Sequence, residues 1–451
     1  PPKVPPEPAG PDGGARAGPN TGSSRVTRAP TLTWAQARTQ GEAAPRSTGH
    51  SLLVIGTSLF LFGGQDDEGF SNQVWAFNVL MTPLTAQRLA VGGNLPAPRA
   101  LHAAVIVGTD MYVVGGIGEG QMFNDVHVLR PHSLRWAQVM PSDVLLTHLE
   151  EVEELPKCCG HSVVAVDGVL HVFGGQLGPS KFSNQLRSLD TRVRRRRWHR
   201  VRAFGDEPSV RSGHSAVAVG TEMYVCGGSA GKGRGFVDLY VIDLAAPMLV
   251  WRRLKTFGEL PWVGLFGASF AHHNSLYVCG VTPPNPVPLA HKLDPQVDRS
   301  AEVYQLPLAS EPLAWERLST SDPKPMACSG HAAACVDNTI YVFGGTVQGQ
   351  PQPSGELWSL ALPPSDASGS APAPARCAQR ARHTPEVDAG DCCRYGVVRA
   401  RQERLAGGGE RFVVQLQDSQ VQFLRETHPH RPGSCLRIVH DGVVQCGTED
   451  I

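Results

Sequence analysis

The 451-residue sequence predicts an all-β fold, a six-bladed β-propeller, from one spacing that recurs along the chain. At five places a histidine is followed thirteen residues later by a Gly-Gly pair. An apolar stretch, a short polar turn and a second apolar stretch lie between them. A self-similar unit of roughly 50 residues is typical of a radial array of small sheets. The five sets are His50 with Gly63-Gly64, His102 with Gly115-Gly116, His161 with Gly174-Gly175, His214 with Gly227-Gly228, and His331 with Gly344-Gly345.

Each repeat divides into four expected strands, a to d, and the fourth repeat shows them well. Residues 213–219 form strand a with the histidine, and residues 223–228 form strand b, which ends in the glycine pair. Strand c begins with a polar residue, then Val or Leu, and often an aromatic. A tryptophan marks strand d. The six strand-c starts are Gln73, Asp125, Gln185, Asp238, Glu302 and Glu356, and the strand-d tryptophans are Trp136, Trp198, Trp251 and Trp315.

Each of these marks has a physical reason. Inner strands are covered on both faces by neighbouring blades, so they are continuously apolar. The glycine pair permits positive φ and close backbone approach near the centre. The tryptophan supplies a large apolar surface to the contact between blades.

Two repeats depart from the pattern. The fifth repeat is degenerate, with Gly267 in the histidine position and Val281 in place of the second glycine, but its strands and Trp315 remain. The sixth repeat has no tryptophan after it, whereas Trp34 precedes the first histidine with the same 16-residue spacing that separates Trp198 from His214. We therefore expect residues 31–37 to supply strand d of the last blade and to close the ring, which removes exposed sheet edges.

The expected domain organisation is a propeller between two less ordered flanks. Residues 1–30 are rich in Pro and Gly and too polar to fold. The propeller covers residues 31–362, and residues 363–393 form a linker. Residues 394–451 are a tail of uncertain fold, in which 411–416, 421–424 and 435–439 are candidate strands.

Composition restricts the class of function. The 41 basic and 41 acidic residues balance, which argues against a nucleic-acid binder. No apolar run approaches the roughly 20 residues that span a bilayer, and we expect no signal peptide. Cys226, Cys279 and Cys335 lie within apolar strands without a pairing pattern, which favours a reducing compartment. We expect a cytoplasmic protein, and a nuclear location is also compatible.

The histidines, double glycines, polar-Val/Leu-aromatic strands and late tryptophans together resemble the kelch repeat. The chain is similar to kelch-domain-containing proteins without a BTB domain, including the Rab effector with kelch motifs. Segments such as Ala44-Pro45-Arg46 and Ala97-Pro98-Arg99, just before the blades, carry this likeness. The resemblance covers residues 31–362 and implies a protein-interaction platform.

No catalytic or metal site is expected. The repeat histidines occur once per blade, so the ring separates them, and we expect them to be structural. The sequence lacks a nucleophile elbow, a phosphate loop and a His-Glu-x-x-His motif. Adjacent Cys392-Cys393 in the tail does not provide the Cys-x2–4-Cys spacing of zinc modules. We therefore expect no enzyme activity and no cofactor.

The loops suggest where partners bind, because variable loops on a rigid scaffold usually carry binding. In four-stranded blades the d–a and b–c connections share one face. The acidic run 150–154, with helical spacing around it, falls there, while the basic run 194–197 falls on the opposite face. We expect the first face to hold a partner peptide whose carboxylates meet basic side chains. The alternative is that these side chains cap strands or bond to neighbouring carboxylates. The candidate residues are Arg46, Arg99, Lys157, Arg211, Lys232 and Arg234.

The function that we predict is a non-enzymatic scaffold or effector that binds proteins through this face, as a monomeric propeller. The alternative is a substrate receptor of a cullin ubiquitin ligase, although the tail has no convincing Leu-x3-Cys box.

Overall fold

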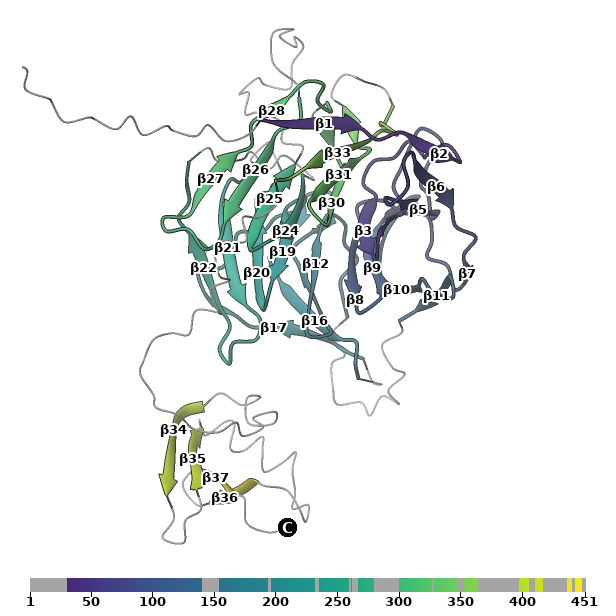
Figure 1. Ribbon diagram of the computed structural model, residues 1–451. Coiled ribbons are helices and arrows are strands. Elements are labelled where there is room, and N and C mark those ends of the chain that lie inside the picture. The colour runs from purple at the N-terminus through teal and green to yellow at the C-terminus, as the bar shows by residue number, and fades with distance from the viewer. Residues whose placement is uncertain are drawn as a thin grey trace, which may run out of the picture.

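The computed structural model describes residues 31–363, apart from 140–153, 194–195, 232–234, 259–260, 262–266, 280–299, 327, 348–349 and 351, and four strands between 397 and 447. The described residues of 31–363 form six antiparallel sheets arranged as the blades of a propeller (Figure 1). The inner strands of neighbouring blades contact one another all the way round the ring. The six-bladed prediction is confirmed.

Every blade has the four expected strands, a to d. Blade one contains β3 (Ser51–Ile55), β4 (Ser58–Phe62), β5 (Val74–Asn78) and β6 (Leu84–Arg88). Blade two contains β8 (Ala103–Val107), β9 (Asp110–Gly118), β10 (Gln121–Arg130) and β11 (Arg135–Gln138). Blade three contains β12 (Ser162–Val166), β13 (Val169–Phe173), β16 (Leu186–Asp190) and β17 (Trp198–Val201).

The second half of the ring repeats this order. Blade four contains β19 (Ser215–Val219), β20 (Glu222–Cys226), β21 (Leu239–Asp243) and β22 (Val250–Leu254). Blade five, the degenerate repeat, contains β24 (Ala268–His272), β25 (Ser275–Cys279), β26 (Val303–Pro307) and β27 (Ala314–Arg317). Blade six contains β30 (Ala332–Val336), β31 (Thr339–Phe343) and β33 (Leu357–Ala361).

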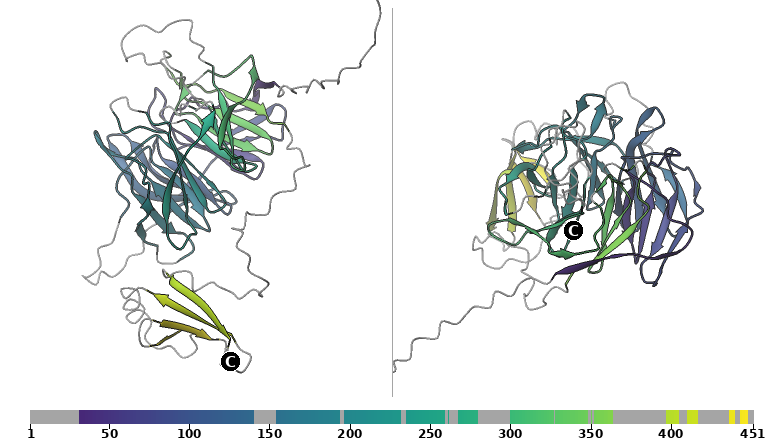
Figure 2. Two further views of the ribbon diagram at one scale, coloured as in Figure 1. Left: turned by 90° about the vertical axis from the view of Figure 1, so that its left-hand side faces the viewer. Right: turned by 90° about the horizontal axis from the view of Figure 1, so that it is seen from above.

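Blade six is completed by the N-terminal strand β1 (Leu32–Gln36), as expected. β1 pairs antiparallel with β33, with Trp34 opposite Leu360 and Gln36 opposite Trp358. In both views of Figure 2 the purple N-terminal strand lies beside the green strands of the last blade. The Trp34 side chain is 1% exposed, so it contributes the same buried tryptophan that strand d provides in blades two to five.

Within the described residues, five blades carry an outer strand that the sequence did not predict. Each is a two- or three-residue segment of the linker that leads from the preceding blade into this blade's inner strand. Each pairs parallel with strand d, so the outer edge of the blade is covered. The five are β2 (Thr39–Gly41), β7 (Gly92–Gly93), β18 (Phe204–Gly205), β23 (Phe257–Gly258) and β28 (Thr320–Ser321).

The core lies between blades rather than within them. Successive side chains of a strand point to opposite faces, so each inner strand supplies two interfaces. In β4, Leu59 and Leu61 pack with Phe343 of blade six, whereas Phe60 and Phe62 pack with Met111 of blade two. This double coverage is why the inner strands are apolar without alternation.

Smaller elements lie outside these sheets. β14 (Gln176–Gly178) and β15 (Lys181–Phe182) form a hairpin in blade three, and β29 (Cys328–Ser329) pairs with β32 (Thr346–Val347) in blade six. In the tail, a four-stranded sheet contains β34 (Val397–Arg404), β35 (Glu410–Leu416), β36 (Leu436–Val439) and β37 (Val443–Gly447). The expected strands at 411–416 and 435–439 thus correspond to β35 and β36.

Several predictions fall outside the described residues. They are the disorder of residues 1–30, the helical spacing around 150–154, Val281, the linker 364–393 and the candidate strand 421–424. None of the described residues belongs to a helix long and apolar enough to cross a membrane.

Candidate protein-interaction face

The strands of a blade fix two faces of the ring. The connections from strand d to strand a and from b to c lie on one side, which we call the loop face. The a–b and c–d turns lie on the other side, which we call the turn face. The a–b turns are two-residue hairpins, such as Asp167-Gly168 with φ of 47° and 74°. Arg196, whose Nη2 donates to the Thr191 carbonyl at 3.0 Å, lies at a c–d turn and therefore on the turn face, as predicted.

The repeat histidines connect neighbouring blades below the loop face. His102 Nε2 and Ser51 Oγ of blade one are hydrogen-bonded at 3.0 Å, and His161 Nε2 donates to the Val114 carbonyl of blade two at 3.1 Å. His214 Nε2 bonds to Ser162 Oγ at 2.8 Å, and His331 Nε2 donates to the Cys279 carbonyl at 2.8 Å. Each of these four imidazoles therefore reaches the preceding blade by a hydrogen bond, and the fifth, His50, lies edge-on against the Phe343 ring of blade six; this supports the expected structural role.

The double glycines make room for these imidazoles. A Cβ on Gly115 would lie 2.8 Å from Cε1 of His161, and one on Gly344 would lie 2.7 Å from Cε1 of His50. Both glycines of every pair have positive φ. In four of the five pairs the first glycine thus receives the histidine of the next blade, which explains why the two motifs recur together; the exception is Gly227, because the next blade has Gly267 in place of the histidine.

Burial keeps the repeat histidines neutral. Desolvation lowers the pKa of His161 to about 4 and is the largest cause of the lowered pKa of His214, about 3, to which the Arg211 charge also contributes. The described residues contain no group of three or more His, Cys, Asp or Glu side chains that could hold a metal.

Arg99 and Arg211, two of the predicted partner contacts, are fully buried. The Arg99 guanidinium donates to both carboxylate oxygens of Asp125 at 2.6 and 2.9 Å and to the Gly115 carbonyl at 2.8 Å. It also lies 4.2 Å from the centre of the Phe123 ring. Burial alone raises the pKa of Asp125, but hydrogen bonds from Arg99 and His127 hold that pKa well below its usual range.

Arg211 has the same surroundings in blade four. It donates to Asp238 at 2.7 and 3.1 Å and to the Gly227 carbonyl at 2.9 Å, and it lies 4.4 Å from the Phe236 ring. Neither guanidinium is available to a partner in this structure. Arg99 and Arg211 instead each bond to a neighbouring carboxylate, which is the alternative that the sequence left open.

Register explains the difference between these arginines and the other two blade-entry cations. Arg99 and Arg211 lie three residues before the repeat histidine, whereas Arg46 and Lys157 lie four residues before it. Because consecutive side chains in an extended segment point in opposite directions, Arg46 and Lys157 are exposed. The residues at the inward position in their blades are Ser47 and Cys158, both buried. Lys232 and Arg234 lie outside the described residues.

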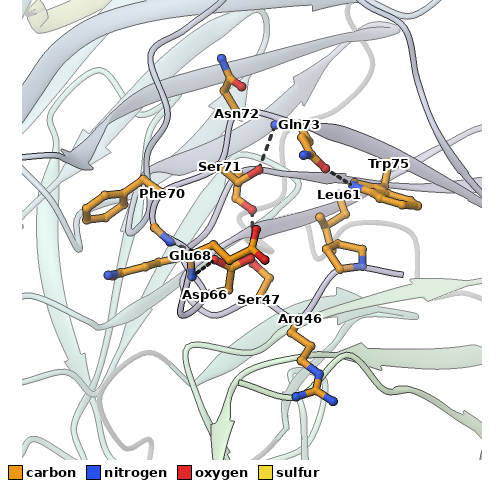
Figure 3. A pocket seen from close by; sticks show the side chains of 14 residues that line it. Arg46, Ser47, Leu61, Asp66, Glu68, Phe70, Ser71, Asn72, Gln73 and Trp75 are labelled. Atoms are coloured by element: carbon orange, nitrogen blue, oxygen red, sulfur yellow. Dashed lines mark hydrogen bonds between the residues drawn. The ribbon is translucent and has the colours of Figure 1, made fainter. Parts of the chain in front are cut away.

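A cavity of about 240 Å³ opens on the loop face at blade one (Figure 3). Leu61 and Trp75 supply its apolar lining, and Ser47, Gln73, Asp66 and Glu68 supply polar groups. Trp75 Nε1 donates to Gln73 Oε1 at 3.1 Å. Arg46 at the edge of the cavity donates to Gln352 of blade six, and Figure 3 shows its guanidinium directed away from Asp66 and Glu68. The sequence analysis placed Arg46 on the loop face but did not predict a cavity.

Comparison with known proteins places this geometry in a family. A family model described as the KLHDC2/KLHL20/DRC7 Kelch-repeats domain matches residues 13–148 and 145–345. The chain belongs to the kelch-repeat family. The resemblance inferred from the repeat motifs is therefore confirmed at the level of the family.

Individual relatives are 25–29% identical to this kelch propeller over the residues that align with it. Kelch domain-containing protein 3 of Bos taurus is 29% identical over 255 residues, covering 54% of this chain and 63% of that protein. The Host cell factor of Drosophila melanogaster is 25% identical and covers 66% of this chain and 20% of that protein. Acyl-CoA-binding domain-containing protein 4 of Arabidopsis thaliana is 25% identical, and the match covers 61% of this chain and 38% of that protein.

The matches with these relatives therefore span between a fifth and less than two thirds of the relatives' own lengths. A solved structure, that of YjhT, superposes with a TM-score of 0.50 at 15% identity, covering 70% of this chain and 95% of that one. This likeness supports the fold of the kelch propeller alone.

Proposed function

We propose that this kelch propeller is a non-enzymatic scaffold or effector that binds partner proteins through its loop face. Kelch propellers are typically protein-binding, although a fold alone does not determine a function. The observation that carries the choice of face is the 240 Å³ cavity, which opens between the entry to blade one and its b–c loop. Loops on a rigid scaffold, with a recess between them, are the usual setting of a binding site.

Exposed side chains on the loop face support the proposal. Val210 is 39% exposed and Val237 is 51% exposed, and each directly precedes one member of the buried Arg211–Asp238 pair. Their backbones are thereby fixed by a buried ion pair while their side chains face solvent. Arg46 and Lys157 add charge to the same face. Apolar anchors surrounded by charged residues are the usual composition of a protein interface.

The test uses a matched pair of double variants of the full chain. Val210→Glu with Val237→Glu changes the loop face, and Leu80→Glu with Met81→Glu changes two comparably exposed apolar residues at a c–d turn on the turn face. Each protein is expressed in cells and its partners are identified by affinity purification and mass spectrometry. We expect partners to be lost with the loop-face variant and retained with the turn-face variant.

The outcomes separate the candidate functions. Identical partner lists from both variants and the intact chain would contradict binding through the loop face. Recovery of cullin and elongin subunits would favour the alternative, a substrate receptor of a cullin ubiquitin ligase. Recovery of small GTPases would instead favour the finer likeness to the Rab effector with kelch motifs. Fractionation of the same cells tests the expected cytoplasmic location.

A further inference from the structure

Blades two and four each enclose an arginine of the chain itself in a slot below the loop face. The slot has three walls: the carbonyl of the first glycine of the pair, the acidic residue at the sequence-predicted start of strand c (Asp125 or Asp238), and an aromatic ring. For Arg211 these are the Gly227 carbonyl, Asp238 and the rings of Phe236 and Tyr240. The Arg211 guanidinium carbon lies 5.4 Å from the centre of the Tyr240 ring.

The cavity of blade one occupies the equivalent slot without such an arginine. Ser47 stands at the arginine position, three residues before His50, and its hydroxyl donates to the Gly63 carbonyl at 3.2 Å. Gln73 stands where Asp238 stands in blade four, and Trp75 stands where Tyr240 stands, whereas Ser71 takes the place of Phe236. Ser47, Gly63, Gln73 and Trp75 all line the cavity.

Three further blades show what groups lie near the polar residue before strand c. In blade three, Arg187 Nη2 donates to Gln185 Oε1 at 3.0 Å, so a glutamine at this position does accept from a guanidinium. In blade five, Lys324 Nζ lies 3.9 Å from Glu302. In blade six, Glu356 accepts from Trp358 Nε1 at 2.9 Å. Blades two to five thus each place a cation of the chain beside this residue.

The charges around the blade-one cavity favour a cation. Asp66 and Glu68 from the b–c loop line it, and the Asp66 carboxylate is held in place by the backbone N–H groups of Glu68 and Gly69 at 2.9 and 3.0 Å. The cation at the cavity edge, Arg46, is directed away from them (Figure 3). The carbonyl of Gly63 and the amide oxygen of Gln73 each accept one hydrogen bond and have a second lone pair.

We propose that this cavity binds an arginine side chain of a partner protein. The guanidinium would lie beside Trp75, as that of Arg211 lies beside Tyr240, and donate to Gly63 O and Gln73 Oε1, with Asp66 and Glu68 balancing its charge. Guanidinium over indole is the most favourable pairing of this kind. The inference rests on the proposed function, because it names the chemistry by which a partner engages the loop face.

The experiment observes Trp75 directly in the full chain. The protein is labelled with 5-fluorotryptophan, and the Trp75 signal in the fluorine NMR spectrum is assigned as the one missing from Trp75→Phe. N-acetyl-arginine amide is titrated to roughly 50 mM, because a single side chain binds with a Kd in the millimolar range. N-acetyl-citrulline amide, nearly the same shape without the charge, is the matched probe. We expect the Trp75 signal to shift with the arginine probe and to respond at least tenfold more weakly to citrulline.

Two variants test the slot itself. Ser47→Arg with Gln73→Asp restores the Arg–Asp pair of blades two and four, so the chain's own guanidinium should fill the cavity and abolish the response to the probe. Asp66→Asn with Glu68→Gln changes only loop residues and should weaken binding several-fold. A thermal melt shows that each variant is folded, and if the rebuilt slot does not fold, the loop variant decides.

Three results would overturn the inference: no Trp75 shift with the arginine probe, equal shifts with citrulline, or an undiminished response in the folded variants. These results leave the proposed function standing if Val210→Glu with Val237→Glu still loses partners. Failure of the proposed function would be seen in the affinity purification, whose result does not depend on the arginine probe.

Discussion

Arg99 and Arg211 lie three residues before the histidine of their repeat, and Arg46 and Lys157 lie four residues before theirs. The sequence showed four basic residues at blade entries, and their spacing from the histidine could have separated them. What it could not show is that the inward position leads to a buried carboxylate. That contact depends on Asp125 and Asp238, which are 26 and 27 residues further along the chain.

The buried Arg99–Asp125 pair gives a stability prediction at the scale of one residue. Arg99→Ala leaves the Asp125 carboxylate and the Gly115 carbonyl without their donor, so we expect the free energy of unfolding to fall by about 3–5 kcal/mol. Arg46→Ala, at the exposed position, should change it by less than about 0.5 kcal/mol. Urea denaturation followed by tryptophan fluorescence measures both, and equal effects would show that burial of Arg99 does not matter.

The repeat histidines give a prediction about pH. His161 is neutral in the folded protein, where its pKa is about 4, and in the unfolded chain it takes up a proton below about pH 6.5. The unfolded state therefore binds more protons between these values, and stability falls as the pH is lowered through this window, by at most about 1.4 kcal/mol per pH unit for each such histidine.

His161→Gln should reduce this dependence, because glutamine does not titrate. We expect the midpoint of urea unfolding of the variant to change less between pH 6.5 and pH 4 than that of the native chain. The lowered pKa of Asp125 affects the native chain and the variant alike, so it does not confuse the comparison. If the urea midpoints of the two proteins changed equally with pH, His161 would not contribute to the pH dependence of stability.

At the scale of the element, the sequence predicted strands a to d and the closing role of Trp34, because buried strands and tryptophans leave local patterns. It did not predict the outer strands, which are only two or three residues long. A signal for them does exist: a glycine lies nine residues before the histidine position in blades one, two, four and five. These are Gly41, Gly93, Gly205 and Gly258, all with positive φ.

The outer strands need these glycines, and the need can be tested. Gly93 has φ of +89°, and a Cβ there would lie 2.2 Å from the Trp136 carbonyl oxygen. Gly93→Ala should therefore destabilise the protein by at least about 1–3 kcal/mol. Gly108→Ala is the control, because Gly108 also has positive φ but has nothing within 4 Å of its Cβ position. Thermal melts should show the larger loss for Gly93→Ala, and equal losses would mean that φ alone matters.

At the scale of the whole molecule, one interface of the ring differs from the others. Gly267 replaces the histidine between blades four and five, and Ser215 Oγ donates to the Gly267 carbonyl at 2.6 Å instead. The sequence identified this repeat as degenerate, but a missing histidine by itself did not show which contact would replace it.

Because Gly267 stands in place of a histidine, we expect the ring to open first between blades four and five. Without an imidazole that links the two blades, amides of β24 should exchange with solvent faster than those of β12, whose blade is linked by His161 and His214 to both neighbours. Hydrogen exchange with mass spectrometry on the full chain compares the two strands. Slower exchange in β24 than in β12 would contradict the idea that the histidines hold the blades together.

The antiparallel pairing of β1 with β33 also decides how the molecule can be attached to something else. β1 begins, and β33 ends, at the turn face, because Trp34 is opposite Leu360 and the two strands run in opposite directions. The chain therefore enters and leaves the propeller on the side away from the cavity. A propeller tethered to a surface through either end, or fused there to another protein, would present its loop face outward to the solution.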